Sequence, residues 1–177
     1  MNSRELYLLT VQENGISEAR FSQLGRKEKS MLDKRNGKYF LKASERQKFS
    51  VALTGGAFDV LHIGHSLILS EAKRLADLLV VVVATDETIE KHKGKKPIHE
   101  ATYRAAMVSS LKPVDLAIVG GADFLATFSR VQPDIVAFGY DQKPFELPDG
   151  TKSVHLEHVK ADPALAKTSR IIRDLGL

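Results

Sequence analysis

The sequence contains no cysteine among its 177 residues, and this absence excludes disulfide bonds and thiolate metal sites. It also lacks a run of about 18 apolar residues, the length that a membrane-spanning helix requires. The first residues, MNSRELYLLTVQENG, have neither the basic start nor the small-residue cleavage site of a secretory signal. We therefore expect a cytoplasmic protein with no membrane contact.

Composition and charge point to an ordinary globular chain with a basic front end. Hydrophobic residues make up 43% and charged residues 27%, and the length suits one domain with an appendage. Residues 1–50 carry eleven Lys or Arg against six Asp or Glu, whereas residues 51–177 carry fifteen against sixteen. A solvated basic face explains so modest an excess more simply than nucleic-acid binding, so nucleic acid is an unlikely partner.

Apolar runs alternate with helical patterns from Ser50 onward. The runs expected to be strands are SVALT, LLVVVVAT, DLAIV, DIVAF and SVHLEH. HSLILSEAKRLA, ATYRAAMVSSL and ADFLATFSRV lie between them and show helical spacing. This order predicts an α/β fold, a Rossmann-like doubly wound parallel sheet of about five strands, with ligands beyond the carboxyl ends of the strands.

The first 49 residues are expected to form a basic, mainly helical extension, and residues 50–177 the main domain. SRELYLLTVQ and SEARFSQLGRKEKSMLDK are predicted helices, and KYFLK is a short strand paired across an Asn36-Gly37 turn. Two helices and a hairpin resemble part of a winged-helix unit. Because no segment has the spacing of a recognition helix, an arm packed on the main domain or on a second subunit is the simpler interpretation.

The candidate site follows the first strand of the main domain. Gly55 and Gly56 allow a ligand to approach the backbone, and His62 and His65 lie where the next helix begins. Two imidazoles would add donors to the free amides and dipole of that helix, so phosphate is the expected ligand. A metal pair is the alternative, but it lacks a third ligand unless Asp59 supplies one, and the histidines could also simply cap the helix.

The stretch GGAFDVLHIGH resembles the strand-turn-helix motif of the cytidylyltransferase-like nucleotidyltransferases, whose hallmark is HxGH after a G-x-F-D turn. The resemblance runs from about Val51 to the C-terminus. It implies the HxGH nucleotidyltransferase fold for residues 50–177. It also implies nucleotide contacts at Gly55, Gly56, Ala57, Phe58, Asp59 and Gly64, although many relatives have threonine where this chain has Ala57.

Further segments are similar to archaeal FAD synthases, namely VVVVATDETIEKHKGKKPI, LKPVDLAIVGG and PDIVAFGYDQ. This resemblance implies transfer of AMP from ATP to FMN, giving FAD and pyrophosphate. Glycerol-3-phosphate cytidylyltransferases share the framework, so CTP with glycerol phosphate is the alternative substrate pair. A nucleotide-sensing regulator that binds DNA through its basic front end is the non-enzyme alternative. The segment KPFELPDGTK fits a flavin pocket and a plain loop equally well.

The resemblance also assigns roles to individual residues. His62, His65, Lys96 and Arg104 are the expected catalytic residues, with Lys96 in a basic loop, KHKGKK, that either closes over phosphates or is merely solvated. The expected contacts to base or ribose, or else turn formers, come from the tetrad Gly139, Tyr140, Asp141 and Gln142.

The start of the final helix is expected to bind the triphosphate, and Mg²⁺ is the expected cofactor. Relatives open this helix with S-T-S/T-K-I, whereas this chain has Lys167, Thr168 and Ser169 before Arg170. The hydroxyls are expected to hold the β- and γ-phosphates, with an altered geometry at Lys167. Mg²⁺ bound mainly through substrate phosphates is implied, with no metal site made of protein ligands, and a homodimer is a possible assembly.

Overall fold

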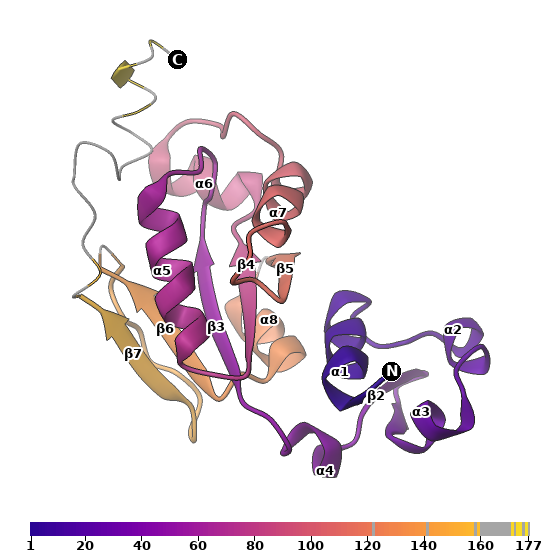
Figure 1. Ribbon diagram of the computed structural model, residues 1–177. Coiled ribbons are helices and arrows are strands. Elements are labelled where there is room, and N and C mark those ends of the chain that lie inside the picture. Colours follow the sequence, from indigo (N-terminus) through magenta and orange to yellow (C-terminus); the bar gives the residue numbers. More distant parts are fainter. Residues whose placement is uncertain are drawn as a thin grey trace. The chain divides into compact units, whose positions relative to one another are not determined.

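The computed structural model describes residues 1–121, 123–140, 142–157, 159, 171, 173, 174 and 176. The chain divides into two compact units, Met1–Ser50 and Val51–Leu177, which differ in architecture (Figure 1). Among the described residues, no helix combines the length and the apolar character that crossing a bilayer requires.

The first unit is built from short helices and one hairpin. Its elements are α1 (Ser3–Gln12), α2 (Glu18–Ser22), α3 (Arg26–Ser30), β1 (Leu32–Arg35), β2 (Lys38–Leu41) and α4 (Ala43–Arg46). Helix α1 begins with a capping box, in which Asn2 and Glu5 satisfy each other's backbone N–H groups. Leu6, Val11 and Ile16 are fully or almost fully buried, so the unit has a small core of its own.

The structure corrects the expected helix over residues 17–34. Helix α2 ends at Ser22, Gly25 is the N-cap of a separate α3, and Leu32–Arg35 is strand rather than helix. The cause is the turn that follows, in which Asn36 and Gly37 have φ angles of 48° and 78°. Two successive left-handed residues suit the tight turn of a β-hairpin, so pairing with β2 overrides local helix propensity.

The second unit is a five-stranded parallel sheet flanked by helices. Its elements are β3 (Val51–Gly56), α5 (Ile63–Arg74), β4 (Leu78–Val83), α6 (Asp86–Lys93), α7 (Ala101–Ser109), β5 (Leu116–Val119), α8 (Phe124–Val131), β6 (Ile135–Gly139) and β7 (Lys152–Leu156). The strand order is β5-β4-β3-β6-β7, and every pairing is parallel. The predicted doubly wound fold is therefore confirmed, with the order reversing at β3.

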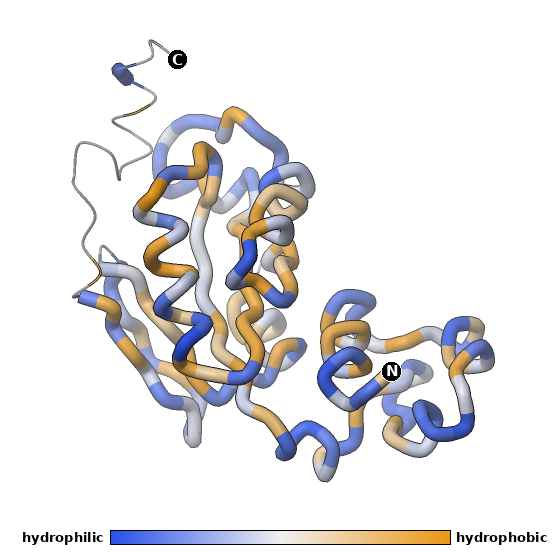
Figure 2. Tube along the Cα trace, in the orientation of Figure 1, coloured by the Kyte–Doolittle hydropathy of each residue, from blue (hydrophilic) through white to orange (hydrophobic). Residues whose placement is uncertain are grey.

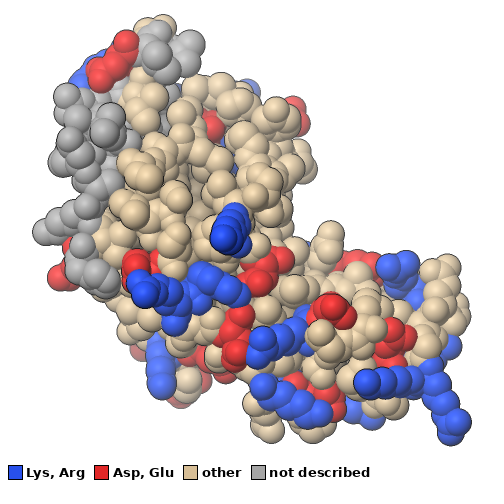
Figure 3. Space-filling model, in the orientation of Figure 1, with Lys and Arg blue, Asp and Glu red and all other residues tan. Residues whose placement is uncertain are grey.

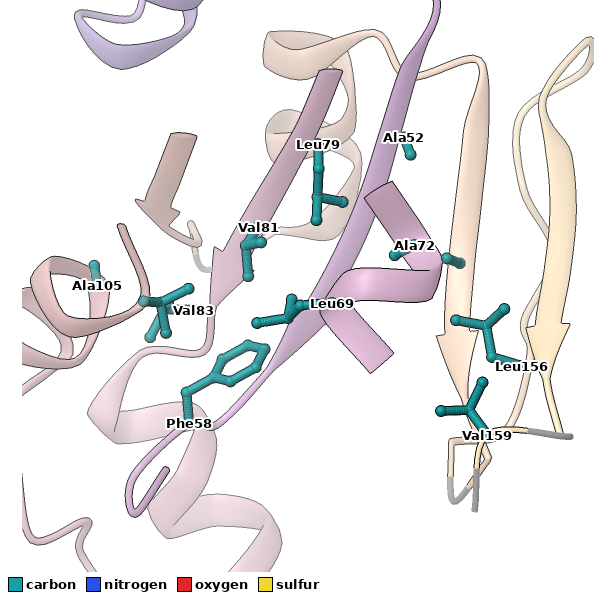
Figure 4. Close-up of a cluster of buried hydrophobic side chains, with 12 residues drawn as sticks. Ala52, Phe58, Leu69, Ala72, Leu79, Val81, Val83, Ala105, Leu156 and Val159 are labelled. Atoms are coloured by element: carbon teal, nitrogen blue, oxygen red, sulfur yellow. The ribbon is translucent and has the colours of Figure 1, made fainter. Parts of the chain in front are cut away.

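Helices cover both faces of this sheet. In Figure 1, α5 lies in front of the strands and α8 behind them, while α7 packs on β4 and β5. Strand β4 is apolar throughout, as Figure 2 shows by its colour, because both of its faces are covered. Figure 4 shows the core on the α5 side, where Phe58 points toward Leu69 beside Val81 and Val83. This packing fixes the turn that follows β3.

Candidate active site

The turn after β3 is tightly constrained at its two glycines. A Cβ atom at Gly55 would lie 3.3 Å from the Val82 carbonyl oxygen, and one at Gly56 would lie 2.9 Å from a Phe58 ring carbon. Phe58 itself has a left-handed φ of 50°, which is strained for a bulky residue, and its ring is buried. The sequence GGAF thus bends the chain sharply, and its two glycines leave the backbone free of side chains at the carboxyl end of the central strand.

His62 and His65 meet at the start of α5. His62 is the N-cap residue, and its backbone carbonyl accepts a hydrogen bond from the His65 N–H at 3.0 Å. Its side chain makes no capping hydrogen bond to the described part of α5, and its ring instead stacks on His65 with 3.8 Å between centroids. Phe58 lies against the other histidine, 4.9 Å from the His65 ring. The two imidazoles therefore form one aromatic stack beside the free amides of α5.

The environment of His65 keeps its imidazole neutral. Burial, together with the nearby His62 and Lys93, lowers the pKa of His65 to about 3. Its Nδ1 atom is buried and has no hydrogen-bond partner among the described residues. A neutral imidazole still carries one N–H donor, and an arriving anion would favour protonation. The stack is therefore suited to a phosphate that brings its own negative charge.

Arg104 was expected to contact phosphate, but its guanidinium is fully buried in the protein. It donates to the carbonyl oxygens of His99, Ala57 and Ala84 and to the Asp86 carboxylate, the last at 2.6 Å. Four of the five N–H donors of an arginine are thus occupied by protein acceptors. The side chain ties the turn after β3 to the end of β4 and to the loop before α7.

Asp59 fixes the same loop from the other side. Its buried carboxylate accepts hydrogen bonds from the backbone N–H groups of Ile98 and His99 at 2.9 to 3.0 Å. Its own carbonyl oxygen lies 3.1 Å from Nδ1 of His99. In the structure, both Asp59 and Arg104 therefore hold backbone segments around the site.

Gln142 joins the ends of two neighbouring strands. The backbone N–H of Gly139 donates to Gln142 Oε1 at 2.7 Å, and Gln142 Nε2 donates to the Gly55 carbonyl oxygen at 2.8 Å. This amide therefore fixes the carboxyl ends of β6 and β3 relative to each other. Tyr140 is half-buried beside it, and the tetrad's Asp141 lies outside the described residues.

The basic segment begins at the end of α6. Lys91 and Lys93 belong to its last turn, Gly94 ends the helix with a left-handed φ of 68°, and Lys95 and Lys96 follow in an exposed loop. Of these lysines, Lys93 is the one whose charge affects His65. Lys167, Thr168 and Ser169 lie outside the described residues.

A pocket of about 900 Å³ opens on the α8 side of the strand ends. Three phenylalanines line it: the Phe145 ring lies edge-on to Phe124 at 4.6 Å and to Phe138 at 5.1 Å. Polar groups come from Thr85 and Thr88 at the start of α6. The remaining lining includes Leu53, Thr54, Gly55, Val82, His92, Gly120, Gly121, Thr127, Val136 and Lys143. The pocket thus reaches the same glycine turn that leads to His62 and His65.

Comparison with known families points to the same site. The family model described as cytidylyltransferase-like matches residues 53–171, which include the glycine turn and both histidines. The chain belongs to the cytidylyltransferase-like family. An FAD synthase from Thermococcus sibiricus is 35% identical over 143 residues, which cover 75% of this chain and 95% of that protein. Over 89 residues, half of this chain, the FAD synthases of Aciduliprofundum boonei and Thermoplasma acidophilum are 54% and 52% identical, covering 59% and 62% of their lengths.

A solved structure supports the same membership. The lipopolysaccharide core biosynthesis protein from Thermoplasma volcanium GSS1 matches with a TM-score of 0.57 and 42% sequence identity. The match covers 60% of this chain and 95% of that one. The chain is therefore a nucleotidyltransferase of this family, and a nucleoside triphosphate is its substrate.

Sequence reasoning missed the aromatic wall of this cytidylyltransferase-like site. Phe124 and Phe138 were part of patterns assigned to a helix and a strand, and only Phe145 stood in a segment considered for a flavin. The sequence carried no signal for this wall, because the exposure of these rings, 37% for Phe124 and 49% for Phe145, appears only once the fold places them together.

Proposed function

We propose that this chain is an FAD synthase, which transfers AMP from ATP to the phosphate of FMN and releases pyrophosphate. The FAD synthases that resemble it, at 35% to 54% identity, support this choice of substrates. CTP with glycerol phosphate remains the second substrate pair, because the family framework alone does not distinguish an adenine from a cytosine.

The pocket beside Gly55 is the observation that carries the choice of acceptor. Its aromatic wall of Phe124, Phe138 and Phe145 offers apolar and edge-on surfaces that suit a large planar ring. An isoalloxazine ring would fill such a space, whereas glycerol phosphate is small and polar and would leave the wall exposed to water. With the ring in this pocket, the phosphate of FMN would point toward the turn after β3.

The reaction is an in-line displacement at the α-phosphorus of ATP. An oxygen of the FMN phosphate forms the new P–O bond, and the bond to pyrophosphate breaks, so no protein nucleophile is required. His62, His65 and the amides at the start of α5 would donate to the α-phosphate oxygens as negative charge develops on them. The exposed Lys95 and Lys96 would contact the departing pyrophosphate, if the loop closes over it.

Arg104 and Asp59 act as positioning residues in this proposal. Arg104 would hold the turn after β3 against the end of β4, and Asp59 would hold the same turn against the loop before α7. Their contribution to catalysis would come from holding this geometry rather than from contact with substrate.

Magnesium fits the proposal as an ion carried by the substrate. Within the described part of the chain, no cluster of three or more His, Asp or Glu side chains is placed to hold a metal ion. In this proposal Mg²⁺ would be bound mainly by triphosphate oxygens, where it would offset phosphate charge. The protein's own share is the pair of histidines, the helix amides and the lysines.

The experiment that tests the proposal supplies both substrate pairs with Mg²⁺. We expect FAD from ATP and FMN, detected by chromatography and flavin fluorescence, and no CDP-glycerol from CTP and glycerol phosphate. Formation of CDP-glycerol without FAD would replace the proposal by its alternative. Failure to form either product, in a protein that binds ATP, would reject both.

A further inference from the structure

The N-terminal unit lies outside the residues that the family model matches, so nucleotidyl transfer does not account for it. It carries eleven basic and six acidic residues, and Figure 3 shows several of its Lys and Arg side chains projecting into solvent. The sequence alone favours a solvated face over a binding surface. The arrangement of the unit's helices and strands favours a binding surface instead.

Two helices of this unit are connected as in a helix-turn-helix. Helix α2 ends at Ser22 and α3 begins at Arg26, and the three residues between them end in Gly25. A turn of three or four residues that often contains glycine is typical of this motif. The β1–β2 hairpin follows α3 directly, and Ile16, just before α2, pairs with Tyr39 of β2 in antiparallel fashion.

This order gives a helix, a one-residue bridge, two helices and a hairpin, which is the arrangement of a winged-helix unit with a short third helix. The hairpin thus stands beside α2 and α3 as a wing. The sequence suggested only part of this arrangement, two helices and a hairpin, because Leu32–Arg35 resembled the end of a helix and Ile16 carried no strand signal.

An aromatic stack fixes the wing against the helices. Phe21 of α2 lies 3.6 Å from Tyr39 of β2 between ring centroids, with the ring planes 4° apart. Lys29 of α3 covers Phe21 at 5.5 Å, and Lys34 of β1 covers Tyr39 at 5.2 Å. Glu18 accepts hydrogen bonds from both Lys34 and the Tyr39 hydroxyl. These contacts hold α2, α3 and the hairpin together, so their outward side chains have fixed positions relative to one another.

The outward side chains are mainly basic. Between residues 26 and 38 there are six Lys or Arg and two acidic residues, Glu28 and Asp33. Glu28 is already bound by the N-terminal amine of Met1 at 2.7 Å. Arg26 on α3 and Arg35 beside the wing turn are exposed, and their side chains form no hydrogen bond or ion pair with any residue that the structure describes.

We propose that this surface, made of α3 and the β1–β2 wing, binds duplex DNA through its backbone phosphates. The main contacts would come from Arg26, Lys27, Arg35 and Lys38, because all four are exposed. Helix α3 has five residues and offers little length for reading bases, so binding is sequence-tolerant and strongly salt-dependent. Duplex RNA fits less well, because its deep and narrow major groove excludes a helix.

The test measures anisotropy of a fluorescein-labelled DNA duplex of about 25 base pairs with the full chain. Four phosphate contacts predict that raising salt from about 50 to about 200 mM weakens binding roughly 100-fold. The double variant Arg26→Glu with Arg35→Glu should lose at least about tenfold in affinity at low salt, and its log–log salt slope should fall by about 2. Its nucleotidyl transfer should stay unchanged, which shows that the second unit remains folded. Its far-UV circular dichroism should match that of the wild type, which shows that the first unit remains folded as well.

Lys112→Glu with Lys152→Glu is the matched control, since both lysines are exposed on the second unit and the net charge changes equally. This control should bind DNA as the wild type does. Equal losses in the two double variants would show a general charge effect and overturn the proposal, as would failure of the wild type to bind at low salt. Equally tight binding of an RNA duplex of the same sequence would overturn the assignment to DNA.

Discussion

The imidazole rings of His62 and His65 lie 3.8 Å apart at the start of α5, and His62 adds to the cost of protonating His65. An anionic substrate would remove that cost, because its charge offsets the second proton. We infer that His65 is neutral at rest and that the nucleotide itself completes the phosphate site.

His65→Ala should abolish most of the catalytic acceleration while leaving the fold intact. Loss of one donor to the developing charge predicts a fall in kcat of about 10²- to 10³-fold, with a smaller change in KM. Initial rates of FAD formation measure both constants. Ser70→Ala, on an exposed position of the same helix, is the control and should keep normal turnover. A His65→Ala enzyme with a normal kcat would remove the histidine from the mechanism.

Stability should depend on pH through the same residue. The pKa of His65 is lowered from 6.5 to about 3 by burial, so between these values the unfolded chain binds more protons than the folded one. The free energy of unfolding should therefore fall as the pH drops below 6.5, with a slope of up to about 1.4 kcal/mol per pH unit from this group. Urea unfolding at several pH values measures it, and His65→Ala should show a shallower slope. Parallel curves would contradict the assignment.

The histidine pair could be predicted from sequence because its geometry is local. His62 and His65 are three residues apart across a helix start, and the strand before them and the helix after them were readable from periodicity. The helix that carries Arg104 could also be predicted from local sequence, but the hydrogen-bond partners of its side chain could not. Its acceptors come from Ala57, Ala84 and His99, which lie on three separate segments, so its burial follows from tertiary packing alone.

Arg104→Met should therefore destabilise the whole second unit. It would leave the carbonyl acceptors around the buried guanidinium without their donors, and each buried polar group left unsatisfied costs about 1 to 3 kcal/mol. Arg104→Lys should be intermediate, because an ammonium cannot reach all four acceptors. Urea denaturation gives the difference, and Arg74→Met, whose side chain is 77% exposed, is the matched control with little expected effect. Wild-type stability combined with a raised KM for ATP would instead support the phosphate contact first expected.

Phe145→Ala should separate the two substrates. Phe145 meets both Phe124 and Phe138 in the pocket wall, and losing a ring contact of roughly 1 to 2 kcal/mol predicts a KM for FMN raised about 5- to 30-fold. The KM for ATP should remain unchanged, because no part of the nucleotide is placed against this wall. Leu125→Ala is the matched control, since Leu125 is exposed on the same helix as Phe124 and does not line the pocket. Steady-state kinetics with each substrate varied in turn distinguishes the outcomes. A raised KM for ATP with normal FMN dependence would mean that the wall holds adenine and that the flavin lies elsewhere.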